Sequence, residues 1–383
     1  MITFEDLDFK NKRVLLRVDF NVPLENRTVT NDFRIRQTTP TIHKILEKGG
    51  SVILVTHIGR PKEGVTDLNL STSVLISALE STLGMPVKFK KNWIDGININ
   101  KGEVLLCENV RFLKGETNND SQLAKKMSEL CDIFINEAFS NSHRAHASNY
   151  GIAQFKKIKA PGPLFLSEIR ALYKIIKKND SPSVAIVGGS KISTKTALIE
   201  NLSKQVDYLV LGGGIANLII KARGFQIGES LFEKTAFEEA CRLFKDIDNI
   251  IFPIDVVCAN EFSKKATGTI KSLNEIAEND LILDLGPKTL EKIASKLQSA
   301  KTILWNGPIG VFEFDNFSNG TKIIAETIAK SSAFSVAGGG DTIASIEKFK
   351  VSDRISYIST AGGAFLEFLE GKKSPVISIL EEV

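Results

Sequence analysis

Arginine side chains gather near the ends of short apolar runs in the first part of the chain. The four that recur in this way are Arg34, Arg60, Arg111 and Arg144, and His57 lies close to the second of them. A planar guanidinium group can donate two parallel hydrogen bonds to a carboxylate or a phosphate. We therefore predict a site for a small anionic ligand, although any single arginine among the four could equally be a solvated surface residue.

Other polar residues of the first part suit the same ligand less specifically. Asp19 and Asn21 could receive a hydroxyl group, but Asn21-Val22-Pro23 would also pass for a turn. His143 and His146 could bind a metal from one face of a helix. No carboxylate or cysteine spacing supports such a site, and we predict no metal there.

In the second part of the chain the candidate binding segments are rich in glycine and lysine. Segment 188–195 follows an apolar run and opens a helix-like stretch, so its backbone amides, with Lys191 and Lys195, could cradle phosphates. It lacks the spacing of a Walker A loop, and neither 212–214 nor 338–340 completes a GxGxxG fingerprint. There is no HRD or DFG arrangement of a protein kinase. Glycines after strands are often only tight turns, but several clusters together favour a flat or phosphorylated ligand; they are 188–189, 212–214, 338–340 and 362–363.

Two acids stand beside these glycines. Asp341 precedes Thr342 at a predicted helix start, where it could cap the helix or hold a magnesium ion. Glu313 could receive ribose hydroxyl groups or be an ordinary surface acid.

The segments that precede these loops are predicted to be β-strands. Near-continuous Val, Ile and Leu runs that alternate with helical stretches are typical of a parallel sheet covered on both faces. The runs are 13–18, 51–55, 104–107, 132–135, 183–187, 208–211, 302–305 and 334–337. Because ligands bind outside the carboxyl ends of such strands, we predict an α/β protein with two doubly wound, Rossmann-like parallel-sheet domains. Proline and glycine at 160–163 mark the join, and an amphipathic helix at 164–178 is the predicted hinge helix.

Composition agrees with this picture and excludes other classes. The chain has 383 residues, 43% hydrophobic and 25% charged, as expected of two or three globular domains. Lys plus Arg exceeds Asp plus Glu by 49 − 45 = +4, too little to indicate a nucleic-acid or polybasic membrane binder. The longest apolar run, 208–220, contains glycines, and the acidic start does not resemble a signal peptide. Four cysteines without CxxC spacing favour buried thiols, so we expect a cytoplasmic protein.

The charges and glycines are also unevenly distributed. Eight of the 12 arginines lie within residues 1–144, and 18 of the 28 glycines lie from 188 onward. The two halves are therefore predicted to bind different ligands. No feature demands an oligomer, and we expect a monomer that binds neither nucleic acid nor a membrane.

From end to end the sequence resembles phosphoglycerate kinase. Seven motifs in order carry the resemblance: Arg17-Val18-Asp19-Phe20-Asn21-Val22-Pro23, Thr56-His57-Ile58-Gly59-Arg60-Pro61, Glu108-Asn109-Val110-Arg111-Phe112, His143-Arg144-Ala145-His146-Ala147-Ser148, Gly188-Gly189-Ser190-Lys191, 305–313 and Gly338-Gly339-Gly340-Asp341-Thr342. The resemblance implies reversible phosphoryl transfer between 1,3-bisphosphoglycerate and ADP, giving 3-phosphoglycerate and ATP in glycolysis. Residues 1–163, with a C-terminal tail of about 370–383, would bind phosphoglycerate. Residues 164–369, which begin with the inter-domain helix 164–178, would bind the nucleotide.

The resemblance also implies residue roles, position by position. The substrate would be bound by Asp19, Asn21, Arg34, His57, Ile58, Gly59, Arg60, Arg111 and Arg144. ATP or ADP would be bound by Lys195, Gly212, Gly213, Gly214, Glu313, Gly339, Gly340, Asp341 and Thr342, with Asp341 on Mg²⁺. The catalytic set would be Arg34, Lys191, Gly362 and Gly363. The acceptor carboxylate is ionised at neutral pH, so no general base is needed, and we expect Arg34 and Lys191 to flank the moving phosphoryl group after hinge closure.

The chain departs from the family pattern at two places. Family members usually read Asp-Ala-Phe-Gly where this chain has Glu137-Ala138-Phe139-Ser140, and Ser-Thr-Gly-Gly-Gly where it has Ala361 at the third position. Serine tolerates a positive φ less well than glycine, which leaves the conformation of the first loop open. The second departure adds a methyl group near the expected hinge. Neither removes a residue of the catalytic set.

Two rival functions come from other classes. A two-lobed anion-binding or nucleotide-binding protein without catalysis would share the hinge and the arginines, but would not need Lys191, Lys195 and Asp341. A nicotinamide-dependent dehydrogenase would require the GxGxxG fingerprint that the chain lacks.

Overall fold

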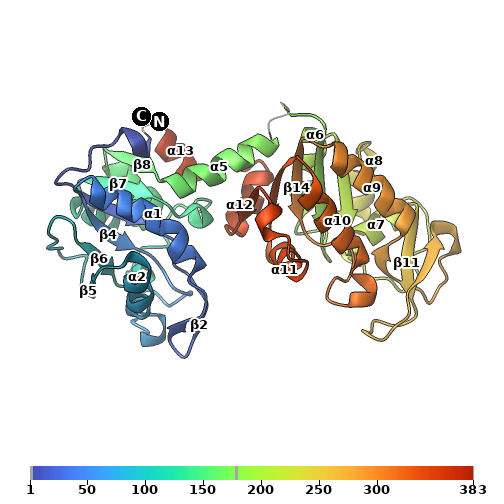
Figure 1. Ribbon diagram of the computed structural model, residues 1–383, viewed down its shortest axis with the longest axis horizontal. Helices are drawn as coiled ribbons and strands as arrows, with labels where there is room; N and C mark the ends of the chain where they lie inside the picture. Colours follow the sequence, from blue (N-terminus) through green and yellow to red (C-terminus); the bar gives the residue numbers. More distant parts are fainter. Residues whose placement is uncertain (1–2, 177–179, 383) are drawn as a thin grey trace. The chain divides into compact units, whose positions relative to one another are not determined.

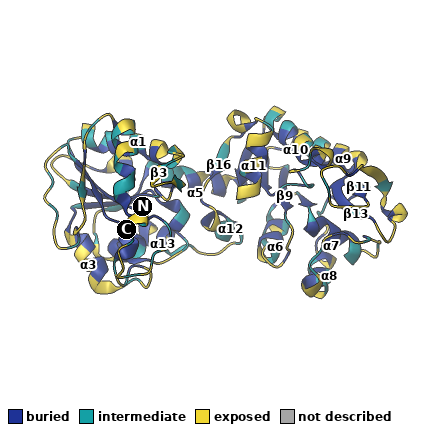
Figure 2. Ribbon diagram, turned by 90° about the horizontal axis from the view of Figure 1, so that it is seen from below, coloured by how far each residue is buried: buried dark blue, intermediate teal, exposed yellow. Residues whose placement is uncertain are grey.

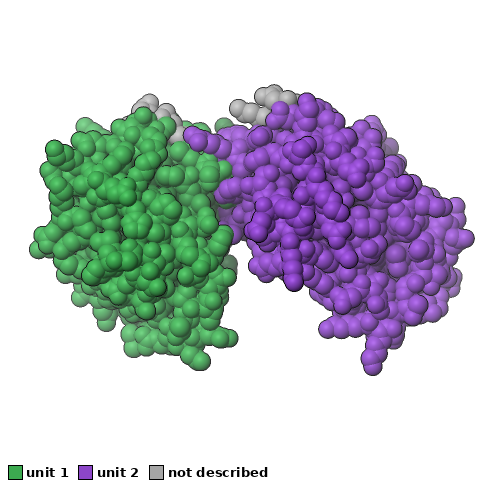
Figure 3. All heavy atoms as spheres, viewed as in Figure 1, with its two compact units in different colours: residues 1–169, 373–383 green, residues 170–372 purple. Residues whose placement is uncertain are grey.

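The computed structural model describes residues 3–176 and 180–382. The chain forms two compact units, Met1–Ile169 with Lys373–Val383, and Arg170–Lys372 (Figure 3). The division falls inside helix α5 (Pro163–Ile176), whereas the predicted domain join precedes that helix. The last two residues of the predicted helix, 177 and 178, lie outside the described residues.

The first unit is built on a six-stranded parallel sheet with the order β5-β6-β4-β1-β7-β8 (Figure 1). Its strands are β1 (Arg13–Arg17), β4 (Ser51–Val55), β5 (Val87–Lys90), β6 (Val104–Cys107), β7 (Ile133–Asn136) and β8 (Lys159–Pro161). Its helices are α1 (Phe33–Glu47), α2 (Ile76–Leu83), α3 (Ser121–Glu129), α4 (Ile152–Phe155) and α13 (Pro375–Glu381). A short hairpin, β2 (Leu24–Glu25) with β3 (Thr28–Val29), precedes α1.

The end of the chain returns to this unit. Ser374 donates through its hydroxyl to the Ser142 carbonyl at 2.6 Å, and the Val376 amide donates to the same carbonyl at 3.3 Å. Helix α13, which follows at once, buries Val376 and Leu380.

The second unit has a five-stranded parallel sheet with the order β10-β9-β14-β15-β16. Its strands are β9 (Ser183–Gly188), β10 (Tyr208–Gly212), β14 (Thr302–Asn306), β15 (Phe334–Gly338) and β16 (Tyr357–Ser359). Its helices are α6 (Thr196–Gln205), α7 (Gly214–Ala222), α8 (Phe237–Lys245), α9 (Pro287–Ser299), α10 (Asn319–Lys330), α11 (Gly340–Lys348) and α12 (Gly363–Leu369). Strands β10 and β14 lie on opposite sides of β9, so the order in which strands are added to the sheet reverses at β9. Ligands of such sheets bind beyond the carboxyl ends of the strands at this reversal.

The central strands are buried along nearly their whole length (Figure 2). Successive side chains of a strand point to opposite faces, so burial at every position means that both faces of each sheet are covered. The eight predicted strands are confirmed, each to within one residue at either end. The predicted fold class, two doubly wound parallel-sheet domains, is confirmed as well.

A second sheet of the second unit was not predicted. It is antiparallel, with the order β12-β11-β13, formed by β11 (Asp255–Ala259), β12 (Thr269–Ser272) and β13 (Leu281–Leu285). Strand β12 is almost wholly exposed, and Asp284 interrupts the apolar run of β13. Neither segment therefore shows the continuous apolar pattern of a central parallel strand.

None of the helices within 3–176 and 180–382 is both long enough and apolar enough to span a bilayer.

Candidate functional site

The first unit collects its polar loops at the carboxyl edge of its sheet. Loops leave this edge after β1, β4, β6 and β7, and they carry Asp19, His57, Arg111 and Arg144 in turn. Arg34 joins them from the first turn of α1. Parallel strands all end at the same edge, which is why residues so far apart in the sequence gather there.

Asp19 and Asn21 form hydrogen bonds that link the loop after β1 to α1 and to the loop after β4. The Arg34 guanidinium donates to the Asp19 carboxylate at 2.5 Å, and both side chains are partly exposed, 29% and 13% respectively. The Asn21 amide oxygen accepts from the Gly59 backbone at 2.9 Å, which joins the loop after β1 to the loop after β4. Gly59 has a φ of +62°, a conformation that favours glycine.

His57 lies behind these loops in a neutral form. It is 4% exposed, and burial together with Arg17, Arg111 and Arg34 holds its pKa well below the ordinary value. Its Nδ1 atom faces the Arg17 guanidinium at 3.3 Å. Since a guanidinium can only donate, Nδ1 is the acceptor, and Nε2 carries the proton that can be offered to a ligand.

The arginines converge. Burial lowers the pKa of Arg111 to about 10, and the positive charges of Arg17, Arg144 and Arg60 act in the same direction. Arg111 is nonetheless charged at neutral pH, and it donates to the Gly59 carbonyl at 2.5 Å. Arg60 and Arg144 are exposed. The structure thus brings the predicted arginines into one region of positive potential, whereas Ile58 is buried in the core below it.

Arg17 and Glu116 were missed by sequence reasoning. Arg17 is 1% exposed and donates to the Ser148 hydroxyl at 2.9 Å, and the same hydroxyl donates to the fully buried Glu116 carboxylate at 2.6 Å. Burial raises the pKa of Glu116, while the charge of Arg17 opposes that rise. Arg17 stands in a motif that the sequence displays, but its hydrogen-bond partner Ser148 lies 131 residues further along the chain.

His146 of the histidine pair is buried beside Glu116. Burial and nearby arginines lower the pKa of His146 to about 4, and its Nδ1 atom lies 4.0 Å from Glu116. Across the described ranges, 3–176 and 180–382, no cluster of three His, Cys, Asp or Glu side chains could hold a metal ion.

The two departures from the family pattern fit without backbone strain. Ser140 lies in a right-handed 3-10 turn, Phe139–Asn141, and donates to the Asp19 carboxylate. Glu137 is fully buried, accepts a hydrogen bond from Thr41 of α1, and accepts another from the Phe165 amide in the first turn of α5. Ala361 is 6% exposed and is not among the described residues with positive φ.

Several glycines of the second unit allow backbone segments to pack closely against each other. A Cβ atom at Gly188 would lie 1.8 Å from the Pro308 carbonyl, and one at Gly307 would lie 2.3 Å from the Gly188 carbonyl. Gly212 meets the same segment, with Pro308 at 2.7 Å. These residues must lack side chains for the ends of β9, β10 and β14 to approach each other.

Part of the same glycine set also lines a pocket of about 560 Å³. Of the residues predicted to bind nucleotide, Gly213, Gly214, Glu313 and Asp341 line it, with apolar walls from Leu231, Phe262 and Ile309. Gly212, Gly339, Gly340 and Thr342 are not among its lining residues. An apolar pocket with a few polar groups at its rim is the usual form of a small-molecule site.

Lys195 is held at the end of β9 beside this pocket. Its ammonium group donates to the Gly188 carbonyl at 2.5 Å and to the Asn306 side chain at 2.7 Å. Burial lowers its pKa to about 8, and the carboxylate of Asp341 opposes that change. Asn306 was not predicted; it also donates to the Gly338 carbonyl at 2.7 Å and so joins the ends of β14 and β15.

Asp341 is not the cap of its helix. Helix α11 begins after Gly339, which is the N-cap residue and has a φ of +100°. Asp341 lies exposed in the first turn of the helix. The Thr342 hydroxyl is instead used internally, where it accepts from the Gly307 amide at 2.7 Å. Lys191 is exposed in the loop before α6. Gly362 precedes α12 with a φ of +56°, and Gly363 is the first residue of that helix.

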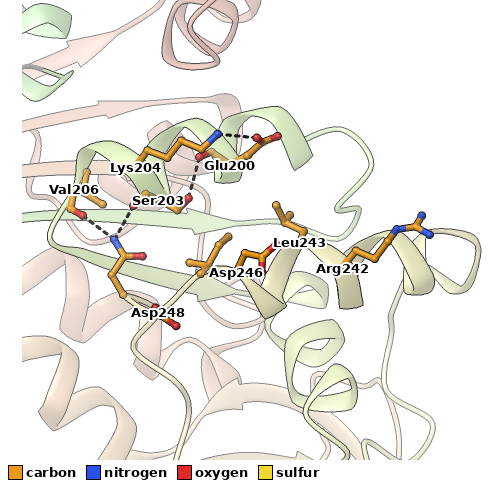
Figure 4. Close-up of a pocket in the computed structure, with 10 residues that line it drawn as sticks. Glu200, Ser203, Lys204, Val206, Arg242, Leu243, Asp246 and Asp248 are labelled. Carbon is orange, nitrogen blue, oxygen red and sulfur yellow. Dashed lines mark hydrogen bonds and ion pairs between the residues drawn. The ribbon is translucent and has the colours of Figure 1, made fainter.

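Another hollow, of about 680 Å³, lies at the opposite edge of the sheet, before β10 begins (Figure 4). Its charged groups are mixed in sign, with Lys204 paired to Glu200 at 2.7 Å and Arg242, Asp246 and Asp248 around it. It shares no lining residue with the glycine-lined pocket.

Known proteins share both the sequence and the fold. A family model described as phosphoglycerate kinase matches residues 4–372. Phosphoglycerate kinase of Francisella tularensis subsp. novicida (strain U112) is 51% identical over 385 residues, which covers 100% of this chain and 98% of that protein. The solved structure of phosphoglycerate kinase from Coxiella burnetii superposes with a TM-score of 0.96 at 45% identity, covering 99% of this chain and 98% of that one. The enzyme from Pyrococcus horikoshii OT3 gives a TM-score of 0.81 at 31% identity, over 100% and 98%. The chain therefore belongs to the phosphoglycerate kinase family.

Proposed function

We propose that this phosphotransferase moves a phosphoryl group reversibly between 1,3-bisphosphoglycerate and ADP, giving 3-phosphoglycerate and ATP. The observation that carries the proposal is the pairing of two chemically different sites. One unit gathers arginines around a neutral histidine, which suits a small ligand with carboxylate and phosphate groups. The other has a glycine-lined apolar pocket with Lys195 at its edge, which suits a nucleotide.

The phosphoglycerate contacts would come from the first unit. Asp19 would accept a hydroxyl group of the ligand, and His57 would donate from Nε2. The cations would be Arg34, Arg60, Arg111 and Arg144. Gly59 and Ile58 would act through backbone groups, because Ile58 has its side chain in the core.

The nucleotide would bind in the second unit, over Gly213 and Gly214, with Glu313 at the ribose and Lys195 at the phosphates. Mg²⁺ is commonly held by one or two carboxylates together with substrate phosphates, and the exposed carboxylate of Asp341 beside Lys195 fits that role. The ion would neutralise charge on the phosphate oxygens. The amides of Gly339 and Gly340, at the start of α11, would add donors for a phosphate.

Catalysis would depend on alignment and on positive charge. The attacking group in the direction of ATP use is a carboxylate that is ionised at neutral pH, so the chain needs no general base. Arg34 and Lys191 would flank the transferring group, with the amides of Gly362 and Gly363 as further donors. These residues belong to different units, so the enzyme would work only when closed, with α5 as the hinge, and closure would protect the acyl phosphate from water. We further propose a cytoplasmic monomer without a nucleic-acid partner.

One coupled assay tests the function: consumption of ATP that requires both 3-phosphoglycerate and Mg²⁺. Binding of both ligands without turnover would support the non-catalytic alternative and contradict the proposal. Arg34→Ala and Lys191→Ala should each lower kcat far more than they raise KM. Matched controls are Arg36→Ala and Lys204→Ala, which remove exposed cations of α1 and α6 and should leave kcat near normal. Near-normal turnover of either test variant would refute its catalytic role.

The closure is tested separately by small-angle scattering. The radius of gyration should fall when both substrates are bound. An unchanged radius with both sites filled would contradict the hinge.

A further inference from the structure

We infer that Ser140, where family members usually have glycine, is a positioning residue for the anion site, and that it acts through Asp19 on Arg34. The inference rests on the proposed function of that site. Its basis is one shared atom: Asp19 Oδ2 accepts from both the Arg34 guanidinium and the Ser140 hydroxyl.

The hydroxyl of Ser140 is itself held in place. The side-chain amide of Asn141 donates to Ser140 Oγ at 3.3 Å, which directs the hydroxyl proton away from that amide and toward Asp19. Asn141 is 5% exposed, and its carbonyl accepts from the Asn149 side chain at 2.9 Å. The donor to Asp19 therefore comes from a turn that the loop after β7 holds firmly.

Asp19 is thereby reached from three sides. Within the described part of the chain its carboxylate accepts from Arg34, from Ser140 and, through Oδ1, from the Asn21 amide at 3.1 Å. An ionised carboxylate has about four acceptor positions. Three are occupied by the protein, and the remaining one is available to a single hydroxyl group of the ligand.

The same arrangement sets the direction of Arg34. Without the Ser140 hydroxyl, the Asp19 carboxylate can rotate and pair more fully with the guanidinium, because among residues 3–176 and 180–382 the donors to Oδ2 are Arg34 and Ser140. Arg34 is then less available to the anion. A glycine at position 140 lacks this hydroxyl donor. In this chain the loop after β7 therefore donates a hydrogen bond to Asp19 that the usual family pattern cannot supply from this position.

The experiment compares Ser140→Ala, Ser140→Thr and the control Ser128→Ala. Ser128→Ala removes an internal hydrogen bond of α3, from its hydroxyl to the Lys125 carbonyl, and has no link to Asp19. We expect Ser140→Ala to raise KM for 3-phosphoglycerate about threefold to tenfold, the effect of losing one ordinary hydrogen bond, and to lower kcat as well, because the effect passes through Arg34. KM for ATP should stay unchanged. Ser140→Thr keeps the hydroxyl and should restore the KM.

A second readout does not depend on turnover. Titration with inorganic phosphate should give a Kd that rises by a similar factor in Ser140→Ala and stays unchanged in Ser128→Ala. If Ser140→Ala leaves both the KM and the phosphate Kd unaltered, the positioning role is wrong, even if Arg34→Ala lowers kcat as expected. If the wild-type chain shows no turnover that depends on 3-phosphoglycerate, the proposed function is wrong. The phosphate titration then still tests whether Ser140 positions the anion site.

Discussion

The Glu137 carboxyl should make the first unit less stable as the pH rises from about 4.5 to about 7. It is fully buried between α1 and the start of α5, and the partners that the structure gives it are the Thr41 hydroxyl and the backbone amides of Phe165 and Leu164. All of them are neutral. Burial therefore dominates and raises the pKa of Glu137 from 4.5 to about 7, despite these hydrogen bonds.

The sign follows from proton binding. Below pH 4.5 the carboxyl is protonated in both the folded and the unfolded chain, and it contributes no pH dependence. Between pH 4.5 and about 7 the folded chain keeps a proton that the unfolded chain has released, so stability falls as the pH rises. Above pH 7 the carboxyl is ionised in both states, and the full cost remains. At about 1.4 kcal/mol for each pH unit between the two pKa values, that cost is about 3 kcal/mol.

The variant that removes this cost is Glu137→Gln. The amide oxygen can accept from the Phe165 amide, and the amide nitrogen can donate to the Thr41 hydroxyl, which is able to accept. The free energy of unfolding of Glu137→Gln should exceed that of the wild type by an amount that grows by about 2 to 3 kcal/mol between pH 5 and pH 8.

The assay can report on the first unit alone. The chain has two tryptophans, Trp93 in the first unit and Trp305 in the second, and both are 1% exposed. In a Trp305→Phe background, urea unfolding followed by emission therefore monitors the environment of Trp93. The control Glu129→Gln, at an exposed end of α3, should show no growing difference. A Glu137→Gln curve that runs parallel to the wild type from pH 5 to pH 8, or converges with it at high pH, would refute the reasoning.

Three further outcomes follow from the contacts. Gly162→Ala places a Cβ atom 2.1 Å from the Glu137 carboxyl carbon, and it should cost about 1 to 3 kcal/mol in the Trp93 transition. Gly188→Ala drives a Cβ atom into the Pro308 carbonyl at 1.8 Å; calorimetry should show loss of ADP binding with the Trp93 transition unchanged. Because the pKa of Lys195 is lowered to about 8, ADP affinity should fall as the amine loses its proton above that pH, and Lys195→Met should remove this dependence while lowering affinity at pH 7.

The central strands were predictable because both of their faces are covered. Full burial demands an apolar residue at every position, and such runs are visible in a single sequence. Strand β5 alternates between buried and exposed positions, and β16 has three residues, so neither stands out in this way. The antiparallel sheet was missed for the same reason.

The anion site was predictable where its residues lie on loops that end neighbouring strands. Arg60 and Arg111 each lie within about five residues of the end of an apolar run, and the topology alone brings them to one edge. Arg17 and Glu116 were not predictable, because their roles depend on contacts between distant segments and on burial. Residue type and spacing do not show that an ionisable side chain is buried, and burial is the main cause of the pKa shifts of His57 and Glu116.

Two glycines of the second unit that were not predicted to bind a ligand, Gly310 and Gly320, accommodate a buried acid. Gly310 and Gly320 face the Asp284 carboxylate, which would lie 2.3 Å and 2.2 Å from their Cβ atoms, and Asp284 accepts from the Gly320 amide in the first turn of α10 at 2.7 Å. Burial raises the pKa of Asp284 to about 7, as it does for Glu137 at the start of α5. Each unit therefore contains a buried acid that accepts from a helix start and is accommodated by glycine. Since the folded-state pKa of both acids is about 7, the two units should lose stability together as the pH rises to about 7, although they bind different ligands.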